Sequence, residues 1–170
     1  MPSGLIRYQN SGGFHFVTFS CYRREPLLAR KDGYAVVEQV MEEVRRRHRF
    51  VVAGYVLMPE HVHVLVSEPE LDSLAVGLKV WKQESSKKLK GEERQFWQRR
   101  YYDFNVRTEK KTVEKLKYMH RNPVVRGLVS RPEEWAWSSY RHYLTGEVGT
   151  VEIESHWTAA RREGLGFNRS

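Results

Sequence analysis

The chain of 170 residues has a single cysteine, Cys21, which excludes a disulfide framework and a thiolate metal cluster. It also lacks any apolar run near the roughly 18 residues that a membrane-spanning helix needs. Residues 1–5 show no basic-then-apolar pattern of the kind that marks a secretory signal. No internal repeat or low-complexity stretch is present. We therefore expect a cytoplasmic protein with no membrane partner.

The chain also has fewer acidic than basic side chains. The 21 aspartates and glutamates face 29 lysines and arginines, giving a formal net charge of +8 at pH 7. Such an excess favours a polyanionic partner, although many basic proteins bind no nucleic acid. Hydrophobic residues at 40% and charged residues at 29% are typical of a globular domain, and the length suits one sizeable core.

The hydrophobic pattern predicts alternating strands and helices. Strands are expected over 14–21, 50–58, 61–66 and, within an extended segment, 96–106; helices are expected over 32–49, 72–89 (with Asp72 as N-cap), 109–121 (ended by Pro123) and 132–144. The remainder is expected to be irregular. This order matches the split βαβ arrangement, so we predict an α+β, ferredoxin-like antiparallel sheet with helices on one face and extra C-terminal helices. In that topology the first and third strands are central.

The most informative segment is His61-Val62-His63. In a strand, side chains alternate with period two, so both imidazoles lie on one face. Val62, Val64 and Val66 then face the opposite side, where helices can cover them. Imidazoles so placed can both reach one cation. The alternative for an isolated pair of this kind is two structural histidines on a half-exposed strand.

A second group of polar residues lies on one face of the helix predicted from residue 109. The spacings of four, three and four align Lys111, Lys115, Tyr118 and Asn122. A different stripe, Val113, Leu116 and His120, is better suited to packing. The alternatives without a function are that Tyr118 is an amphipathic tyrosine with its hydroxyl in water, and that Asn122 only ends the helix.

Together these segments resemble a known family. Met58-Pro59-Glu60-His61-Val62-His63, Tyr118-Met119-His120-Arg121-Asn122-Pro123-Val124 and Trp135-Ala136-Trp137-Ser138-Ser139-Tyr140 are similar to segments of REP-associated tyrosine transposases, a branch of the single-tyrosine HUH transposases. The resemblance runs from about residue 14 to residue 146. Two motifs in this order, within a matching order of strands and helices, are far more specific than either alone.

The resemblance implies a role for each matching residue. His61 and His63 bind a divalent ion, Tyr118 is the nucleophile, and Asn122 supplies a third ligand. The implied ion is Mg²⁺ or Mn²⁺, although the ligand types would also permit zinc. Glu60 stands where these motifs often have asparagine. The residues Val125-Arg126-Gly127, which follow Pro123, differ slightly from the usual family sequence. Neither departure touches the reacting groups, but the DNA contacts near them are not predicted.

The implied activity is that of a metal-dependent, site-specific single-stranded DNA endonuclease and strand transferase. It would act on REP-type hairpin elements through a covalent 5′-phosphotyrosine intermediate. The resemblance also favours a monomer over a dimer.

Basic clusters supply the candidate DNA contacts, although each can also be a solvated face. These candidates are Lys79, Lys82, Lys87, Lys88, Arg99, Arg100, Lys111, Lys115 and Arg121.

We expect residues 1–146 to form the nuclease domain and 147–170 a tail. The stretch 146–156 has glutamates but no lysine or arginine. Such a segment can fold back over the basic DNA groove and partly inhibit it. The alternative is a flexible acidic terminus that does not dock.

Two other classes of function stay open. A four-stranded ferredoxin-like sheet with surface aromatics is also the plan of a non-catalytic RNA-recognition module that binds single strands. That alternative does not explain why His61, His63 and Tyr118 occur together, and the sequence contains no RNP-type motif. A zinc hydrolase would use water as nucleophile and needs a carboxylate as general base, for which Glu60 is available.

Overall fold

The computed structural model describes residues 13–167 of the chain. Its four strands are β1 (Phe14–Ser20), β2 (Val52–Leu57), β3 (His61–Ser67) and β4 (Tyr102–Val106). They form one antiparallel sheet in the order β2-β3-β1-β4. The first and third strands are central, as the split βαβ order predicts. The predicted α+β, ferredoxin-like fold is confirmed.

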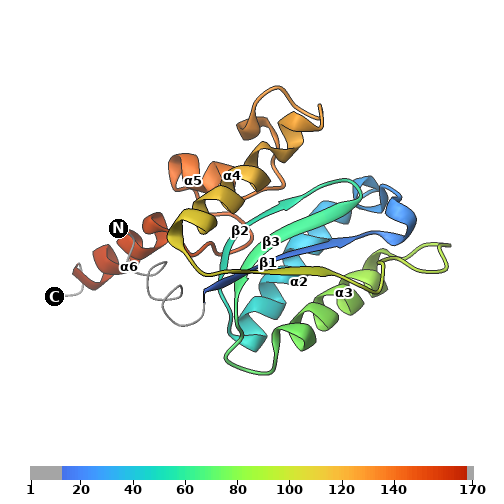
Figure 1. Cartoon of the computed structure of the whole chain (residues 1–170), viewed down its shortest axis with the longest axis horizontal. Helices are drawn as coiled ribbons and strands as arrows, with labels where there is room; N and C mark the ends of the chain where they lie inside the picture. Colours follow the sequence, from blue (N-terminus) through green and yellow to red (C-terminus); the bar gives the residue numbers. More distant parts are fainter. Residues whose placement is uncertain (1–12, 168–170) are drawn as a thin grey trace.

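Helices cover both faces of this sheet (Figure 1). The five α-helices are α2 (Gly33–His48), α3 (Leu74–Leu89), α4 (Glu109–Val125), α5 (Tyr140–Thr145) and α6 (His156–Phe167). Short 3₁₀ turns occupy Tyr22–Arg24, Leu27–Ala29 and Pro132–Glu134. Helices α2 and α3 pack together on one face, and α4 lies on the other (Figure 1). None of the described helices combines the length and the apolar character needed to cross a bilayer.

The alternation along β3 sets which side chains face α4. Val62, Val64 and Val66 are buried in the core shared with α2 and α3, as predicted. Leu65 belongs instead to the core that contains Leu116 and Met119 of α4. Because residues two apart share a face, the two histidines of β3 lie on the α4 side of the sheet.

Two helix ends differ from prediction. Ser73, not Asp72, caps α3, because its hydroxyl accepts a hydrogen bond from the Val76 N–H while Asp72 adopts a positive φ of 64°. Pro123 does not end its helix, which continues to Val125. In the last turn proline forfeits only one backbone bond, and the Arg126 N–H still donates to the Asn122 carbonyl at 2.9 Å.

The packing stripe of α4 is also shifted by one position. Val113 was expected to pack but is 41% exposed, whereas Thr112 is fully buried. The expected partners Leu116 and His120 are buried as predicted. Spacings of four, three and four from Thr112 through Leu116 to Met119 and Pro123 follow one side of the helix, and Val113 lies about 100° away.

The C-terminal region is more ordered than the sequence indicated. The single helix expected over 132–144 is a 3₁₀ turn followed by the short α5, and α6 forms where irregular chain was expected. Only 102–106 of the expected extended segment joins the sheet as a strand. Val151 and Ile153 are each 3% exposed and belong to the main core. The segment before α6 is therefore packed against the domain.

Candidate active site

Two imidazoles converge on the α4 face of the sheet. His61 begins β3, and His63 follows on the same face, with exposed fractions of 4% and 6%. Their Nε2 atoms lie 3.0 Å apart. Adjacent ligands of an octahedral ion at about 2.1 Å have a similar separation, so the pair can hold one divalent ion through Nε2.

The other nitrogen of each ring is held by a neighbouring side chain. Nδ1 of His61 lies 2.9 Å from Oε1 of Glu60, and Nδ1 of His63 lies 2.7 Å from Oγ1 of Thr18. An ionised carboxylate only accepts hydrogen bonds, so His61 carries its proton on Nδ1 and turns the Nε2 lone pair toward the cavity. Such fixing of tautomer and orientation is the usual support of a metal-binding histidine.

Glu60 connects this support to two arginines. Nη1 of Arg126 donates to its Oε1 at 2.7 Å, and Nη2 of Arg24 lies 3.7 Å from the same oxygen. Burial opposes ionisation of Glu60, but hydrogen bonds from Arg126 and His61 outweigh it and lower the pKa of this carboxyl. A carboxylate so engaged is a poor general base, which counts against the zinc-hydrolase alternative.

The environment keeps both imidazoles neutral. Burial, reinforced by the nearby cationic side chains, lowers the pKa of His63 to about 3. Burial also lowers the pKa of His61, although the hydrogen bond with Glu60 opposes that shift. Metal coordination needs the unprotonated ring, so both histidines are in the state that binds a cation at neutral pH.

Tyr118 projects from α4 beside this pair. Its ring centroid lies 5.4 Å from that of His63 and 6.1 Å from that of Phe16, in edge-on geometry. The side chain is 55% exposed and lines the same cavity as the two histidines. The phenol is thus supported by neighbouring rings while remaining accessible to a substrate.

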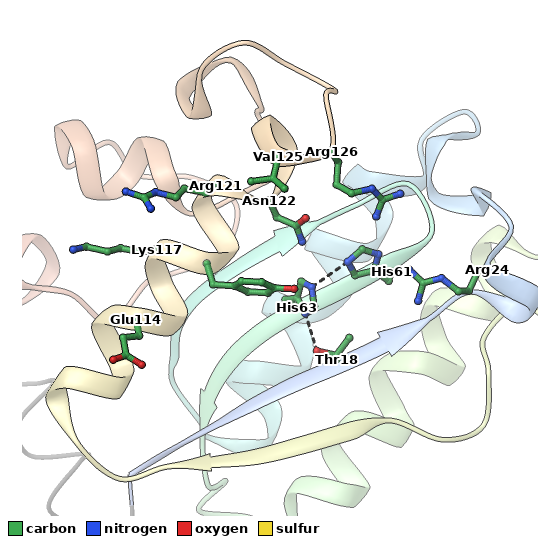
Figure 2. Close-up of a pocket in the computed structure, with 11 residues that line it drawn as sticks. Thr18, Arg24, His61, His63, Glu114, Lys117, Arg121, Asn122, Val125 and Arg126 are labelled. Carbon is green, nitrogen blue, oxygen red and sulfur yellow. Dashed lines mark hydrogen bonds between the residues drawn. The ribbon is translucent and has the colours of Figure 1, made fainter.

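Asn122 lies one helical turn after Tyr118 and lines the cavity too. Figure 2 shows its side chain directed from α4 toward the two imidazoles. Within the described part of the chain, no group of three histidine, cysteine or acidic side chains could hold a metal ion. A metal ligand at Asn122 stays a prediction.

The cavity has a volume of about 670 Å³ and a basic lining. Four cations, Arg24, Lys117, Arg121 and Arg126, line it together with one carboxylate, Glu114. Glu114 is neutralised by Lys111 at 3.0 Å. Figure 2 shows Arg24 and Arg126 on the His61 side, whereas Lys117 and Arg121 extend outward from α4. An anion such as a phosphodiester is favoured here.

Sequence reasoning missed several of these residues. Thr18 and Arg24 come from distant parts of the chain and reach the site only through the pairing of β1 with β3. The sequence indicated Glu60 only as a departure from the family motif and as a possible general base. It did not indicate that Glu60 orients His61. Its position next to the histidine was the only signal available.

Most predicted DNA contacts lie elsewhere. A second groove of about 680 Å³ runs along α3, on the opposite side of the sheet, and contains no acidic residue. Its basic residues are Lys79, Lys82, Lys87, Lys90, Arg94 and Arg99. Lys88 lines a different depression. Arg100 lines neither the α3 groove nor the cavity beside the histidine pair.

Three of the predicted lysines have structural partners, and one of them is Lys111 with its ion pair to Glu114. Nζ of Lys82 donates to the Gln98 and Arg99 carbonyls at 2.6 and 3.2 Å, and its burial lowers its pKa. Lys115 lies over the rings of Phe16 and Phe104. Among the predicted DNA contacts, only Arg121 lines the cavity beside the histidine pair.

Comparisons with known proteins agree with this geometry. A family model described as "Transposase IS200 like" matches residues 9–122. A REP-associated tyrosine transposase inferred in Haemophilus influenzae is 29% identical over 159 residues, covering 86% of this chain and 90% of that protein. The REP-associated tyrosine transposase of Escherichia coli is 26% identical over 144 residues, covering 79% and 80%.

A solved structure shares the fold. It is a REP-associated tyrosine transposase bound to a REP hairpin, with a TM-score of 0.69 and 23% identity, covering 84% of this chain and 86% of that one. Transposases of this family generally depend on a metal ion. The family match spans both the histidine pair and the tyrosine helix, and the chain belongs to the IS200-like transposase family, whose members are tyrosine transposases.

Proposed function

We propose that this transposase cuts and rejoins single-stranded DNA at REP-type hairpins through a covalent link to Tyr118. The observation that carries the proposal is the convergence of His61 and His63 at 3.0 Å between their Nε2 atoms, with the Tyr118 ring beside them in a basic cavity. The hairpin partner is inferred from the relatives, one of which is seen bound to a REP hairpin.

The reaction is a transesterification at phosphorus. The Tyr118 phenol loses its proton as its oxygen bonds to phosphorus, and the bond to the 3′ oxygen breaks. The 3′ oxygen takes a proton from solvent, which leaves a 5′-phosphotyrosine and a free 3′-hydroxyl. Because the link retains a phosphodiester, a 3′-hydroxyl from another strand can reverse the step without an external energy source.

His61, His63 and Asn122 would hold the divalent ion, which we propose is Mg²⁺ or Mn²⁺. When bound, the ion would supply positive charge that offsets the negative charge of the phosphate, and so would favour attack by a weak nucleophile. A phenol has an ordinary pKa of about 10 and needs such help at neutral pH. Glu60 and Thr18 keep both rings oriented, and the half-exposed Tyr118 can approach phosphorus from the α4 side.

Arginines of the cavity and lysines of α3 have separate tasks in this proposal. Arg24, Arg121 and Arg126 neutralise phosphates next to the cut, because they line the cavity itself. Lys79, Lys87 and Arg99 of the α3 groove contact DNA farther from the cut. Lys88, Arg100 and Lys111 remain candidate contacts on the surrounding surface.

The proposal is tested by incubating labelled single strands that carry a REP-type hairpin with the protein and Mg²⁺ or Mn²⁺. We expect a protein–DNA adduct that survives denaturant. His61→Ala and His63→Ala should each abolish it, and Asn122→Ala should reduce it less, because water can replace a neutral ligand. A wild-type adduct formed equally well after removal of all divalent ions would contradict the proposal, as would wild-type levels in either histidine variant.

A further inference from the structure

Two aromatic side chains stand exposed at the edge of the sheet next to the active site. Strand β4 is an edge strand that pairs only with β1 within the described sheet. Tyr102 of β4 is 57% exposed and Phe104 is 37% exposed. Val106, two residues farther along, is buried in the α4-side core, so all three side chains point to the face that carries the histidines.

The strand register joins these rings to the catalytic residues. Thr18 of β1 pairs with Tyr102 on one side and with His63 on the other. Neighbouring strands are about 4.8 Å apart, so the Tyr102 backbone lies only about 10 Å from that of His63. Thr18 also bonds His63 directly at 2.7 Å. The exposed rings therefore border the catalytic residues on the same face of the sheet.

A cation lies between the aromatic edge and α4. Nζ of Lys115 is 4.8 Å from the ring centroid of Phe104 and 4.7 Å from that of Phe16. No carboxylate lies within 4 Å of this ammonium group in the part of the chain described here. Its position beside a ring, with the charge unneutralised, suits a phosphate that follows a stacked base.

The opposite face of β4 has a different character. His15 contacts the carboxylates of Glu68 and Asp103 there, at 2.5 and 2.9 Å. Acidic groups on that side repel a phosphate backbone. Only the α4 side of β4 therefore combines exposed rings with an unpaired cation.

We propose that Tyr102 and Phe104 form a stacking platform for bases of the single strand that leads to the scissile phosphate. Side chains two residues apart on a strand are separated by about 6.7 Å, which leaves each ring its own base. RNA-recognition sheets stack bases on surface aromatics in the same way. The proposal rests on the proposed function and assigns to these two rings the binding of the flanking strand.

The test measures binding without cleavage. Fluorescence anisotropy, without divalent ions, follows a labelled single strand of about 20 nucleotides of mixed sequence, longer than one such site. A second probe of equal length has abasic sites throughout, so it keeps the phosphates but offers nothing to stack. The variants are Tyr102→Leu, Tyr102→Phe and Phe104→Leu. Trp157→Leu is the control, because Trp157 on α6 is also 37% exposed.

We expect Tyr102→Leu and Phe104→Leu each to weaken binding of the normal strand about tenfold, and Tyr102→Phe and Trp157→Leu to leave it unchanged. On the abasic probe all variants should match the wild type. Equal losses on both probes, or no loss in either leucine variant, would overturn the platform. If the wild type forms the covalent adduct but the leucine variants bind DNA normally, the platform is wrong and the proposed function stands. If the wild type forms no adduct, the proposed function is wrong.

Discussion

The side chains around the histidine pair explain why two neutral rings point at one place. Each imidazole is held at Nδ1, His61 by Glu60 and His63 by Thr18, so the Nε2 atoms meet in the cavity. Glu60 is in turn held by Arg126. Tyr118 needs no such support to stay accessible, because its ring lies against His63 and Phe16 at the surface.

Tyr118→Phe should abolish adduct formation and leave DNA affinity nearly unchanged. Only the nucleophilic oxygen is removed, and the ring keeps its contacts with His63 and Phe16. Adduct formation is read on a denaturing gel, and affinity is read by anisotropy without divalent ions. An adduct that persists in the variant would remove Tyr118 from the proposed role.

Glu60→Gln should raise the metal concentration needed for half-maximal adduct formation by about tenfold, at unchanged affinity for DNA. The amide keeps the shape of the side chain but loses the charge that fixes the Nδ1 proton of His61. Glu114→Gln is the matched control, because this carboxylate also lines the cavity but pairs with Lys111. Equal metal requirements for the two variants would show that Glu60 does not support the histidine.

Helix α4 is seated on the sheet through a close approach at Gly54 of β2. A Cβ built there would lie 2.4 Å from Cδ2 of Leu116 and 3.2 Å from Cε of Met119. Only glycine leaves room for these side chains, and they set the height of the helix that carries Tyr118 and Asn122. The position of Tyr118 beside the histidines thus depends on a residue outside the cavity.

We expect Gly54→Ala to destabilise the protein by about 1–3 kcal/mol and to slow adduct formation more than it weakens DNA binding. Leu116→Ala alone should destabilise by about 2–5 kcal/mol. The double variant should cost less than the sum, because the alanine at 54 fills part of the space vacated at 116. Urea unfolding measures all three, and additive losses would contradict the close approach.

Sequence periodicity predicted the elements whose pattern is local. Period two placed His61 and His63 together, and the helical spacing placed Tyr118 and Asn122 on one side of α4. It could not predict Thr18 and Arg24 as neighbours of the histidines, because strand pairing brings them there. The predicted end of the helix at Pro123 was wrong for a related reason. The sequence pattern does not show that the residues after Pro123 keep backbone hydrogen bonds, which extend the helix.

The sheet separates a face that carries the histidine pair from a face covered by α2 and α3. The segment before α6 packs on the α2 and α3 side, because Val151 and Ile153 belong to that core. The Glu154 N–H donates to the Val52 carbonyl at 2.8 Å. Glu152 and Glu154 pair with Arg162, and Glu152 also approaches Arg45. In this arrangement the acidic side chains face these arginines, so regulation of the DNA groove by residues 147–170 stays a prediction.

A chain that ends at Thr145 should be less stable than the full-length protein by about 3 kcal/mol or more. It loses the buried side chains of Val151 and Ile153, each worth about 1.5–3 kcal/mol. A chain that ends at Ser155 keeps both and serves as the comparison. Urea denaturation should place the shorter chain lowest, and equal midpoints for both truncations would show that this segment adds nothing to the core.

Mass spectrometry of the trapped adduct identifies which residue carries the DNA. After incubation with the hairpin substrate and Mg²⁺ or Mn²⁺, the protein is digested with nuclease and trypsin. We expect the nucleotide mass on the tryptic peptide Tyr118–Arg121, linked through its 5′ phosphate to the tyrosine. A nucleotide found on Tyr101, Tyr102 or any other residue would show that Tyr118 is not the nucleophile.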